Sequence, residues 1–261
     1  MGIINVTPDS FYTGSRFQGM EEILRQAEKM LKEGAAILDI GAQSTRPGSK
    51  QVGVEEELNR LMAGIGLLHD HFPEAILSVD TYHAEVARQA VAAGAAMVND
   101  ISGGSFDTDM IVTVGRLKCP YICMHIKGSP ETMHHDPAYD NVTREVLDYF
   151  IKKVELCRRA GIRDVIIDPG FGFSKTIMHN FQLLKDLAVL GTLNKPVLAG
   201  VSRKSTIYKT LQITAEEALN GTTVLNTICL LNGASILRVH DVKEAMETIK
   251  LVTEVQGSKV R

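Results

Sequence analysis

The sequence predicts an α/β fold, a (β/α)8 barrel of eight parallel strands (a TIM barrel), and three observations support this class. Short apolar runs alternate with longer segments of helical periodicity along the whole chain. The apolar runs show no polar face, which is typical of parallel strands covered by crossover helices. The length of 261 residues fits this barrel, which usually takes about 250.

Eight apolar runs mark the expected strands, and eight periodic segments mark the expected helices. The strands are expected at residues 3–6, 37–40, 76–79, 97–99, 121–124, 165–167, 197–201 and 236–239. The helices are expected at residues 21–33, 55–71, 83–93, 108–116, 141–160, 180–189, 215–231 and 243–253. Gly34, Gly94 and Gly233 each stand between a helical segment and a strand, where glycine can stop a helix in the left-handed conformation.

The composition is that of an ordinary globular enzyme, with 44% hydrophobic and 23% charged residues. No proline- or serine-rich linker and no block of like charge divides the chain, so we expect residues 1–261 to form one catalytic domain. The net charge of −3 offers no general attraction for nucleic acid or for acidic membranes. An anionic ligand would therefore need a local cluster of cations.

The sequence also bears on location. The first residues lack the basic and long apolar stretches of a secretory signal, and no apolar run reaches the length of a membrane span. The four cysteines are too few for a disulfide framework. These features favour a cytoplasmic protein.

Each expected strand ends in a polar or charged side chain. Active sites of such barrels lie at the carboxyl ends of the strands, so this pattern predicts a polar pocket there. The alternative is that polar residues merely begin the loops. The residues are Asn5, Asp39, Asp80, Asn99 with Asp100, His125, Asp168, Ser202 with Arg203 and Lys204, and Arg238 with His240.

Asp80, Asn99 and Asp168 offer carboxylates and an amide to a ligand. A carboxylate accepts two parallel N–H bonds well, and a 2-aminopyrimidinone edge presents such a fork. These residues suit a flat heterocycle that is rich in N–H donors.

Arg203, Lys204, Arg238 and His240 gather positive charge in an otherwise acidic protein. Such a cluster at the strand ends indicates a phosphate or diphosphate site. For Arg238 and His240 the alternative is an ion pair with Asp241 or with another carboxylate at a strand end.

Two loops after the first two strands add candidates. Asn5 and Asp9 supply hard oxygens that suit a Mg²⁺ shared with diphosphate. The loop at residues 44–48 offers a hydroxyl, a cation and a proline–glycine turn. Long ordered loops on the active face of a barrel commonly act as lids.

Seven motifs, in order along the chain, resemble those of dihydropteroate synthases, a family of pterin-binding barrels. One such motif would be weak evidence, but a collinear set from residue 1 to about residue 254 is specific. The motifs are MGIINVTPDSF (1–11), STRPG (44–48), SVDT (78–81), NDI (99–101), DPGFGF (168–173), SRKS (202–205) and RVHDV (238–242). One departure is Gln43, which stands where glutamate is common before STRPG.

The resemblance implies a reaction and a role for each motif residue. The enzyme would be an alkyl transferase that joins 6-hydroxymethyl-7,8-dihydropterin diphosphate to p-aminobenzoate, with ionisation of the pterin C–O bond first. Asp80, Lys204, Arg238 and His240 would be catalytic. The implied pterin set is Asp80, Asn99, Asp168 and Lys204; the diphosphate set is Asn5, Arg238 and His240, with Mg²⁺ at Asn5, alone or with Asp9; the p-aminobenzoate set is Thr45, Arg46, Pro47, Phe173, Lys204 and Ser205.

The family also implies a homodimer, with apolar surface on the helix at 215–231, and a target for sulfonamides. Two other functions remain open. A methyltetrahydrofolate-dependent methyltransferase shares the barrel but does not need Arg46, Lys204, Arg238 and His240. A non-catalytic pterin-binding homologue would be expected to lose loop or cationic residues, yet all are present.

Overall fold

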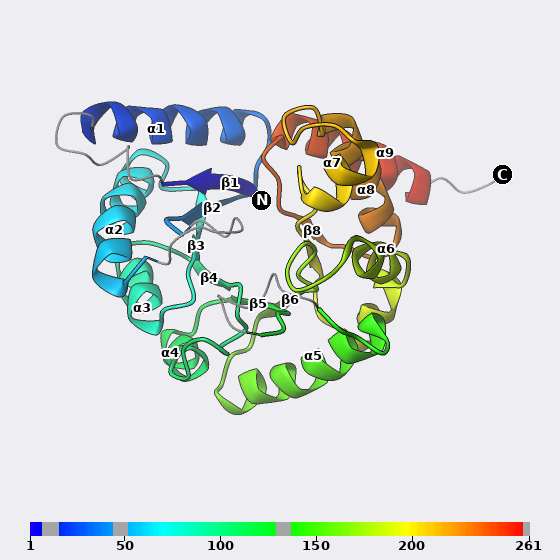
Figure 1. The fold of residues 1–261 in the computed structure, drawn as a ribbon. Helices are drawn as coiled ribbons and strands as arrows, with labels where there is room; N and C mark the ends of the chain where they lie inside the picture. The colour runs from blue at the N-terminus through cyan, green and yellow to red at the C-terminus, as the bar shows by residue number, and fades with distance from the viewer. Residues whose placement is uncertain (7–15, 44–51, 129–136, 258–261) are drawn as a thin grey trace. The chain divides into compact units, whose positions relative to one another are not determined.

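The structure is a computed structural model, and it describes residues 1–6, 16–43, 52–128 and 137–257. In these ranges eight strands alternate with helices in the expected order (Figure 1). The strands are β1 (Gly2–Asn5), β2 (Ile37–Gly41), β3 (Ile76–Asp80), β4 (Met97–Asp100), β5 (Tyr121–Met124), β6 (Val165–Asp168), β7 (Leu198–Ala199) and β8 (Ile236–Leu237).

The helices are α1 (Arg16–Lys32), α2 (Val54–His71), α3 (Ala84–Ala92), α4 (Met110–Leu117), α5 (Val142–Arg159), α6 (Ile177–Lys185), α7 (Ser205–Leu211), α8 (Leu219–Leu231) and α9 (Val242–Gly257), with the 3₁₀ helix η2 (Leu187–Leu193) after α6. In the described part of the chain, no helix is long and apolar enough to cross a membrane.

The contacts divide the chain into two compact units, with boundaries that run through α5 and β6. Unit 1 comprises Met1–Met124 and Lys152–Ile166, and unit 2 comprises His125–Ile151 and Ile167–Arg261. That residues 1–261 form one domain stays a prediction.

In unit 1 the strands β1 to β5 lie side by side, with α1 to α4 on one side of them (Figure 1). The pairs are parallel and in register, so that Asn5, Gly41, Asp80 and Asn99 form one row across the sheet. Side chains in one row share a face, and those two positions earlier share it too. Residues on the opposite face are apolar and fully buried; they are Ile4, Leu38, Ile40, Leu77, Val79 and Val98. The sheet therefore packs one face on the helices and leaves polar groups on the other.

Three glycines end helices of unit 1 and unit 2 as predicted. The φ angles of Gly34, Gly94 and Gly233 are 100°, 114° and 93°. In each case the next residue donates its backbone N–H to a carbonyl of the last helical turn, as in Ala35 to Met30 at 2.9 Å. This closing bond satisfies a carbonyl that the helix leaves open.

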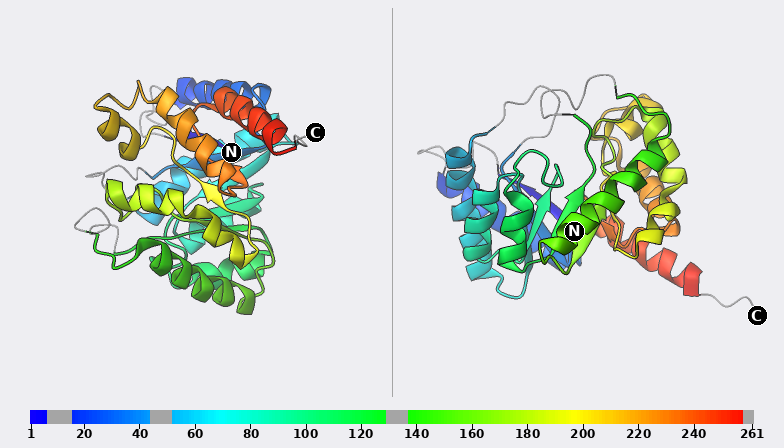
Figure 2. Two further views of the ribbon diagram at one scale, coloured as in Figure 1. Left: turned by 90° about the vertical axis from the view of Figure 1, so that its right-hand side faces the viewer. Right: turned by 90° about the horizontal axis from the view of Figure 1, so that it is seen from below.

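Unit 2 differs from expectation after β7. A separate helix, α7, begins at Ser205, where the sequence analysis placed none, and α8 begins at Leu219 rather than at residue 215. The α7 sequence, STIYKTL, is rich in β-branched and aromatic residues with low helix propensity, which hid it. The strands β7 and β8 have two residues each instead of five and four. Helices α8 and α9 lie side by side (Figure 2).

Candidate active site

The polar face of unit 1 brings two predicted ligand-binding residues together. Asp80 and Asn99 are neighbours in register at the ends of β3 and β4. Gly41 stands beside them on β2, and a Cβ there would lie 3.1 Å from the Cβ of Asp80. Glycine at position 41 therefore leaves room for the Asp80 side chain.

Asp39 belongs to the same face, although the sequence analysis gave it no role. It lies two positions before Gly41 and is fully buried. Asn99 donates from Nδ2 to Oδ2 of Asp39 at 2.9 Å. This bond fixes the orientation of the Asn99 amide, so its oxygen can serve as an acceptor. The sequence placed Asp39 among the polar residues at strand ends, whereas the strand register shows that it stands inside β2.

Asn5 ends β1 on the same face and is exposed. The chain is held there by the backbone N–H of Val6, which donates to the carbonyl of Gly41 at 2.8 Å. An exposed amide oxygen at a strand end fits the predicted magnesium role. Four other predicted site residues lie outside the described residues: Asp9, Thr45, Arg46 and Pro47.

Gln43 and Val52 flank the segment 44–51, and the side chain of Gln43 links them. Its Nε2 donates to the carbonyl of Val52 at 2.7 Å, and its Oε1 accepts from the N–H of Val52 at 3.1 Å. The same Nε2 donates to Oε2 of Glu57, a fully buried residue of α2, at 3.1 Å. Burial raises the pKa of Glu57, and hydrogen bonds from Thr81 and Gln43 oppose that rise. The amide both donates and accepts here, which a glutamate carboxylate could not do.

Asp168, at the end of β6, is buried in unit 2 among positive charges. Its Oδ1 accepts the backbone N–H of Gly170 at 2.7 Å. Burial raises the pKa of Asp168, while the charges of Lys204, Arg238 and Lys175 and the bond from Gly170 lower it. The structure thus places Asp168 and Lys204, two residues of the predicted pterin set, within electrostatic reach of each other.

Lys204 is fixed against the turn that follows Asp168. Its Nζ donates to the carbonyl of Phe171 and lies 4.6 Å from the ring centroid of Phe173. Gly172 has a φ of 81°, and a Cβ there would lie 3.0 Å from Cδ of Lys204. The contact of Lys204 with Phe173 joins two residues that the sequence analysis assigned together. Ser205, the first residue of α7, follows Lys204 and is partly exposed.

Arg238 follows β8 and donates its backbone N–H to the carbonyl of Ala199 at 3.0 Å. Gly200 separates it from Lys204. A Cβ at Gly200 would lie 3.7 Å from Nζ of Lys204 and 3.9 Å from the Cβ of Arg238. Two residues with cationic side chains therefore lie beside Gly200, which itself adds no side chain between them.

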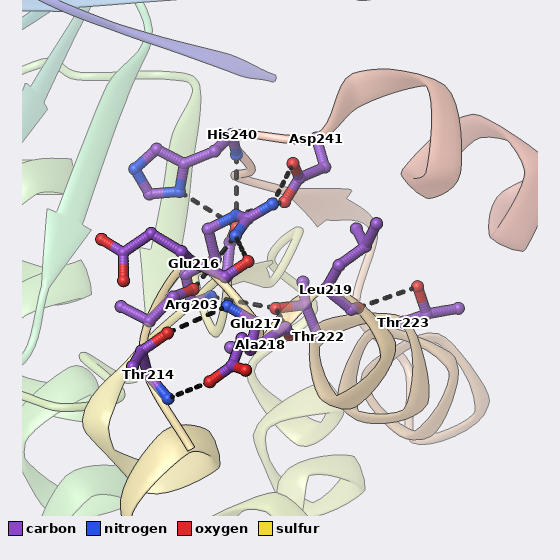
Figure 3. Close-up of polar contacts among 12 residues, drawn as sticks. Arg203, Thr214, Glu216, Glu217, Ala218, Leu219, Thr222, Thr223, His240 and Asp241 are labelled. Atoms are coloured by element: carbon purple, nitrogen blue, oxygen red, sulfur yellow. Dashed lines mark hydrogen bonds and ion pairs between the residues drawn. The ribbon is translucent and has the colours of Figure 1, made fainter.

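The prediction that Arg203 belongs to this anion-binding cluster is wrong. Its Nε and Nη2 each donate to Asp241 at 2.8 Å, and its Nη1 donates to the carbonyl of Ala215 at 3.0 Å (Figure 3). The guanidinium is thereby neutralised and turned toward the loop before α8. Asp241, the partner considered for Arg238 or His240, pairs with Arg203 instead. The two residues are 38 positions apart, so the sequence did not reveal the pair.

His240 was counted as a cation, and this too needs correction. The loss of water around the ring, and then the charge of Arg238, lower the pKa of His240 to about 4. Ser202 Oγ accepts the backbone N–H of His240 at 3.2 Å and lies 3.0 Å from its Nδ1. A Ser202 hydroxyl that donates to Nδ1 leaves the proton of the neutral ring on Nε2. His240 is a hydrogen-bond donor in this state.

The chain is similar in sequence and in structure to known proteins of one family. Residues 1–240 match the sequence model of a family described as pterin binding enzyme. Dihydropteroate synthase of Escherichia coli strain K12 is 40% identical over 261 residues, which are 99% of this chain and 92% of the relative.

Two solved structures are similar over almost the whole chain. Dihydropteroate synthase of Yersinia pestis, in a sulfonamide drug complex, has a TM-score of 0.92 and 37% identity, covering 99% of this chain and 94% of that one. The Xanthomonas albilineans enzyme with 4-aminobenzoic acid has a TM-score of 0.91 and 39% identity, covering 99% and 93%. Together with the order of strands and helices, this similarity confirms the predicted (β/α)8 class.

Proposed function

The chain belongs to the dihydropteroate synthases within the family of pterin-binding enzymes, and from this we propose the reaction it catalyses. It joins 6-hydroxymethyl-7,8-dihydropterin diphosphate to p-aminobenzoate and yields 7,8-dihydropteroate and diphosphate. The C–O bond to diphosphate breaks, a C–N bond to the arylamine forms, and the amine loses one proton. The observation that carries the proposal is the pair of cationic residues Lys204 and Arg238, which lie beside Gly200 and whose charges both act on the buried Asp168.

Polar side chains of each unit, taken by itself, are candidates for pterin binding. In unit 1 we assign it to Asp80 and Asn99, supported by Asp39, which holds the Asn99 amide at 2.9 Å. In unit 2 we assign it to Asp168 and Lys204. Carboxylates suit the N–H fork of the pterin ring, and the buried position of Asp168 strengthens such bonds. A carboxylate near the ring also favours the cation that forms when the C–O bond breaks.

We assign the leaving diphosphate to Arg238, His240 and Asn5. Arg238 supplies permanent positive charge, and neutral His240 supplies an N–H from Nε2. As negative charge develops on the leaving oxygen, these donors stabilise it without reorganisation. The approach of the anion also favours the protonated form of His240, which strengthens the interaction further.

We infer that p-aminobenzoate lies against Phe173, Lys204 and Ser205, with Thr45, Arg46 and Pro47 from the loop that follows β2. The support within the described residues is the stacking of the Lys204 ammonium over the Phe173 ring at 4.6 Å. A cation on an aromatic ring offers both apolar contact and a partner for a carboxylate. Sulfonamides should compete at the same place, as mimics of the arylamine.

Magnesium fits the donor set, with Asn5 as the candidate ligand and Asp9 as a second. Among the described residues no group of three His, Cys, Asp or Glu side chains is placed to hold a metal. A Mg²⁺ that takes few protein ligands and shares the diphosphate oxygens suits such a set. When bound, the ion would neutralise charge on the leaving diphosphate.

We also infer a homodimer in the cytoplasm. On α8, Val224 and Leu231 are 49% and 52% exposed, which is the apolar surface that the sequence analysis expected near residues 215–231. Burial of such side chains against a second copy is favourable. All four cysteines are buried and none forms a disulfide, which suits a reducing compartment.

The test is release of diphosphate from dihydropterin diphosphate with Mg²⁺, with and without p-aminobenzoate. Release that depends on p-aminobenzoate supports the proposal, while folded protein with no release above background contradicts it. Methyl transfer from methyltetrahydrofolate, run in parallel, decides for the alternative enzyme. Pterin binding without either activity decides for a non-catalytic homologue.

A further inference from the structure

Lys175 has a position in unit 2 that none of the roles above explains. It follows the DPGFGF motif and is only 9% exposed. Its Nζ lies 2.9 Å from Nδ1 of His125 and 3.1 Å from the carbonyl oxygens of both Gly170 and Phe173. The three contacts match the three protons of an ammonium group.

His125 completes this arrangement as an acceptor. Burial, and then the charge of Lys175, hold the pKa of His125 well below its usual value. The ring packs edge-on against Tyr149, with centroids 4.9 Å apart, and Tyr139 and Phe150 lie nearby. A neutral His125 can accept at Nδ1 from Lys175 and keep its own proton on Nε2.

Burial of an ammonium group among neutral acceptors costs free energy unless a negative charge nearby compensates its own. The available carboxylate is that of Asp168. Gly170 links the two residues, because its N–H donates to Asp168 at 2.7 Å and its carbonyl accepts from Lys175 at 3.1 Å. The charge of Lys175 lowers the pKa of Asp168, as do Lys204 and Arg238.

Asp168 in turn affects the pKa of Lys175. Burial lowers the pKa of Lys175 to about 7, Asp168 opposes this shift, and Lys204 adds to it. Among the described residues, Asp168, Lys204 and His125 are charged or titratable groups that act on or contact Lys175. Lys127 acts on His125, and Tyr139 packs against its ring. Between the pKa of Asp168 and about pH 7, Lys175 and Asp168 are both charged.

We propose that Lys175 is a positioning residue for pterin binding, whose ammonium group, seated on His125 and the turn at 170–173, keeps Asp168 in the carboxylate form that accepts pterin N–H groups. The proposal rests on the function assigned above. Lys175 also has a second effect. Its Nζ binds the turn that carries Phe171 and Phe173, and Lys204 contacts both of these residues.

The test compares binding of 6-hydroxymethyl-7,8-dihydropterin diphosphate, by calorimetry from pH 4.5 to 8, in wild type and in Lys175→Met, Lys175→Arg and Lys127→Met. Removal of the charge raises the pKa of Asp168. We therefore expect the acid limb of binding in Lys175→Met to move up by about one pH unit, with binding about tenfold weaker below it. Lys175→Arg restores the position of the limb, and Lys127→Met, an exposed control, leaves it unchanged.

Failure of the proposed function and failure of the proposed role of Lys175 give different results. Wild-type protein that does not bind the pterin contradicts the proposed function, whereas an unshifted acid limb in Lys175→Met contradicts the role of Lys175. If neither Lys175 variant folds, wild-type protein with 13C-labelled lysine gives the answer by NMR. An ammonium form of Lys175 at pH 6 supports the proposal, and a neutral amine at that pH overturns it.

Discussion

Arg203 and Asp241 form a two-point ion pair in which both hydrogen bonds are 2.8 Å long. Each partner is next in sequence to a residue proposed to act on the substrate, Lys204 in one case and His240 in the other. The pair therefore ties the start of α7 to the loop after β8 (Figure 3). Planar, two-point pairs of arginine with a carboxylate fix orientation as well as distance.

Replacement of Asp241 by asparagine tests this tie. The variant keeps the shape of the side chain but removes its charge, and Arg203 is only 25% exposed. We expect the free energy of unfolding to fall by about 2 kcal/mol, measured by urea denaturation, and the KM for the pterin diphosphate to rise. Asp148→Asn, at an exposed pair with a 3.9 Å contact, should change neither quantity. Equal stability of both variants would show that the pair contributes nothing.

Lys204→Met should lower kcat without unfolding the protein. The substitution keeps the apolar stem against Gly172 and removes the ammonium that Phe171 and Phe173 hold in place. Loss of a preorganised charge at a reacting centre typically costs about 100-fold or more. Lys209→Met, an exposed lysine of α7, the helix that Lys204 precedes, is the matched control. Turnover of the Lys204 variant within about twofold of wild type would rule out the catalytic role.

Gln43→Ala should weaken the use of p-aminobenzoate. The change removes both hydrogen bonds to Val52 and the one to Glu57, so the two residues that flank the segment 44–51 lose their link. We expect the KM for p-aminobenzoate to rise by about tenfold, equivalent to about 1.4 kcal/mol, with little change in the KM for the pterin. Gln89→Ala, which loses a hydrogen bond to Glu85 on the surface of α3, serves as control. A rise in both KM values alike would point to general destabilisation.

We predict that diphosphate binding depends on pH through the protonation of His240. Its pKa of about 4 in the free protein rises when an anion binds beside it, so binding takes up a proton between about pH 4 and 6.5. Affinity for inorganic diphosphate should therefore increase as the pH falls through this window. Because diphosphate itself titrates, the measured quantity is the difference in proton uptake between wild type and His240→Gln, from calorimetry in two buffers. No difference would contradict the assignment.

The sequence predicted the strands of the fold well, because each is a short apolar run that the sheet buries on at least one face. It failed where the local pattern is weak. The helix α7 has few strong helix formers, and β7 and β8 are extended chain of which only two residues each pair as strand.

The site could be predicted only in part. Residues at strand ends, such as Asp80 and Asp168, are visible because they interrupt apolar runs. Asp39 interrupts its apolar run in the same way, but only the structure shows that it supports Asn99. Lys175 lies in the turn beyond a motif and carries no such signal. The partner of Arg203 is distant in sequence, and the pKa of His240 depends on burial; both follow from tertiary contacts alone.

Product analysis tests most directly whether this chain makes dihydropteroate. Purified protein is incubated with dihydropterin diphosphate, p-aminobenzoate and Mg²⁺, and both products are quantified by mass spectrometry and a diphosphate assay. We predict equal amounts of 7,8-dihydropteroate and diphosphate, and about 100-fold less of both with Lys204→Met at the same protein concentration. Diphosphate released without dihydropteroate, or no product from folded wild-type protein, would contradict the account.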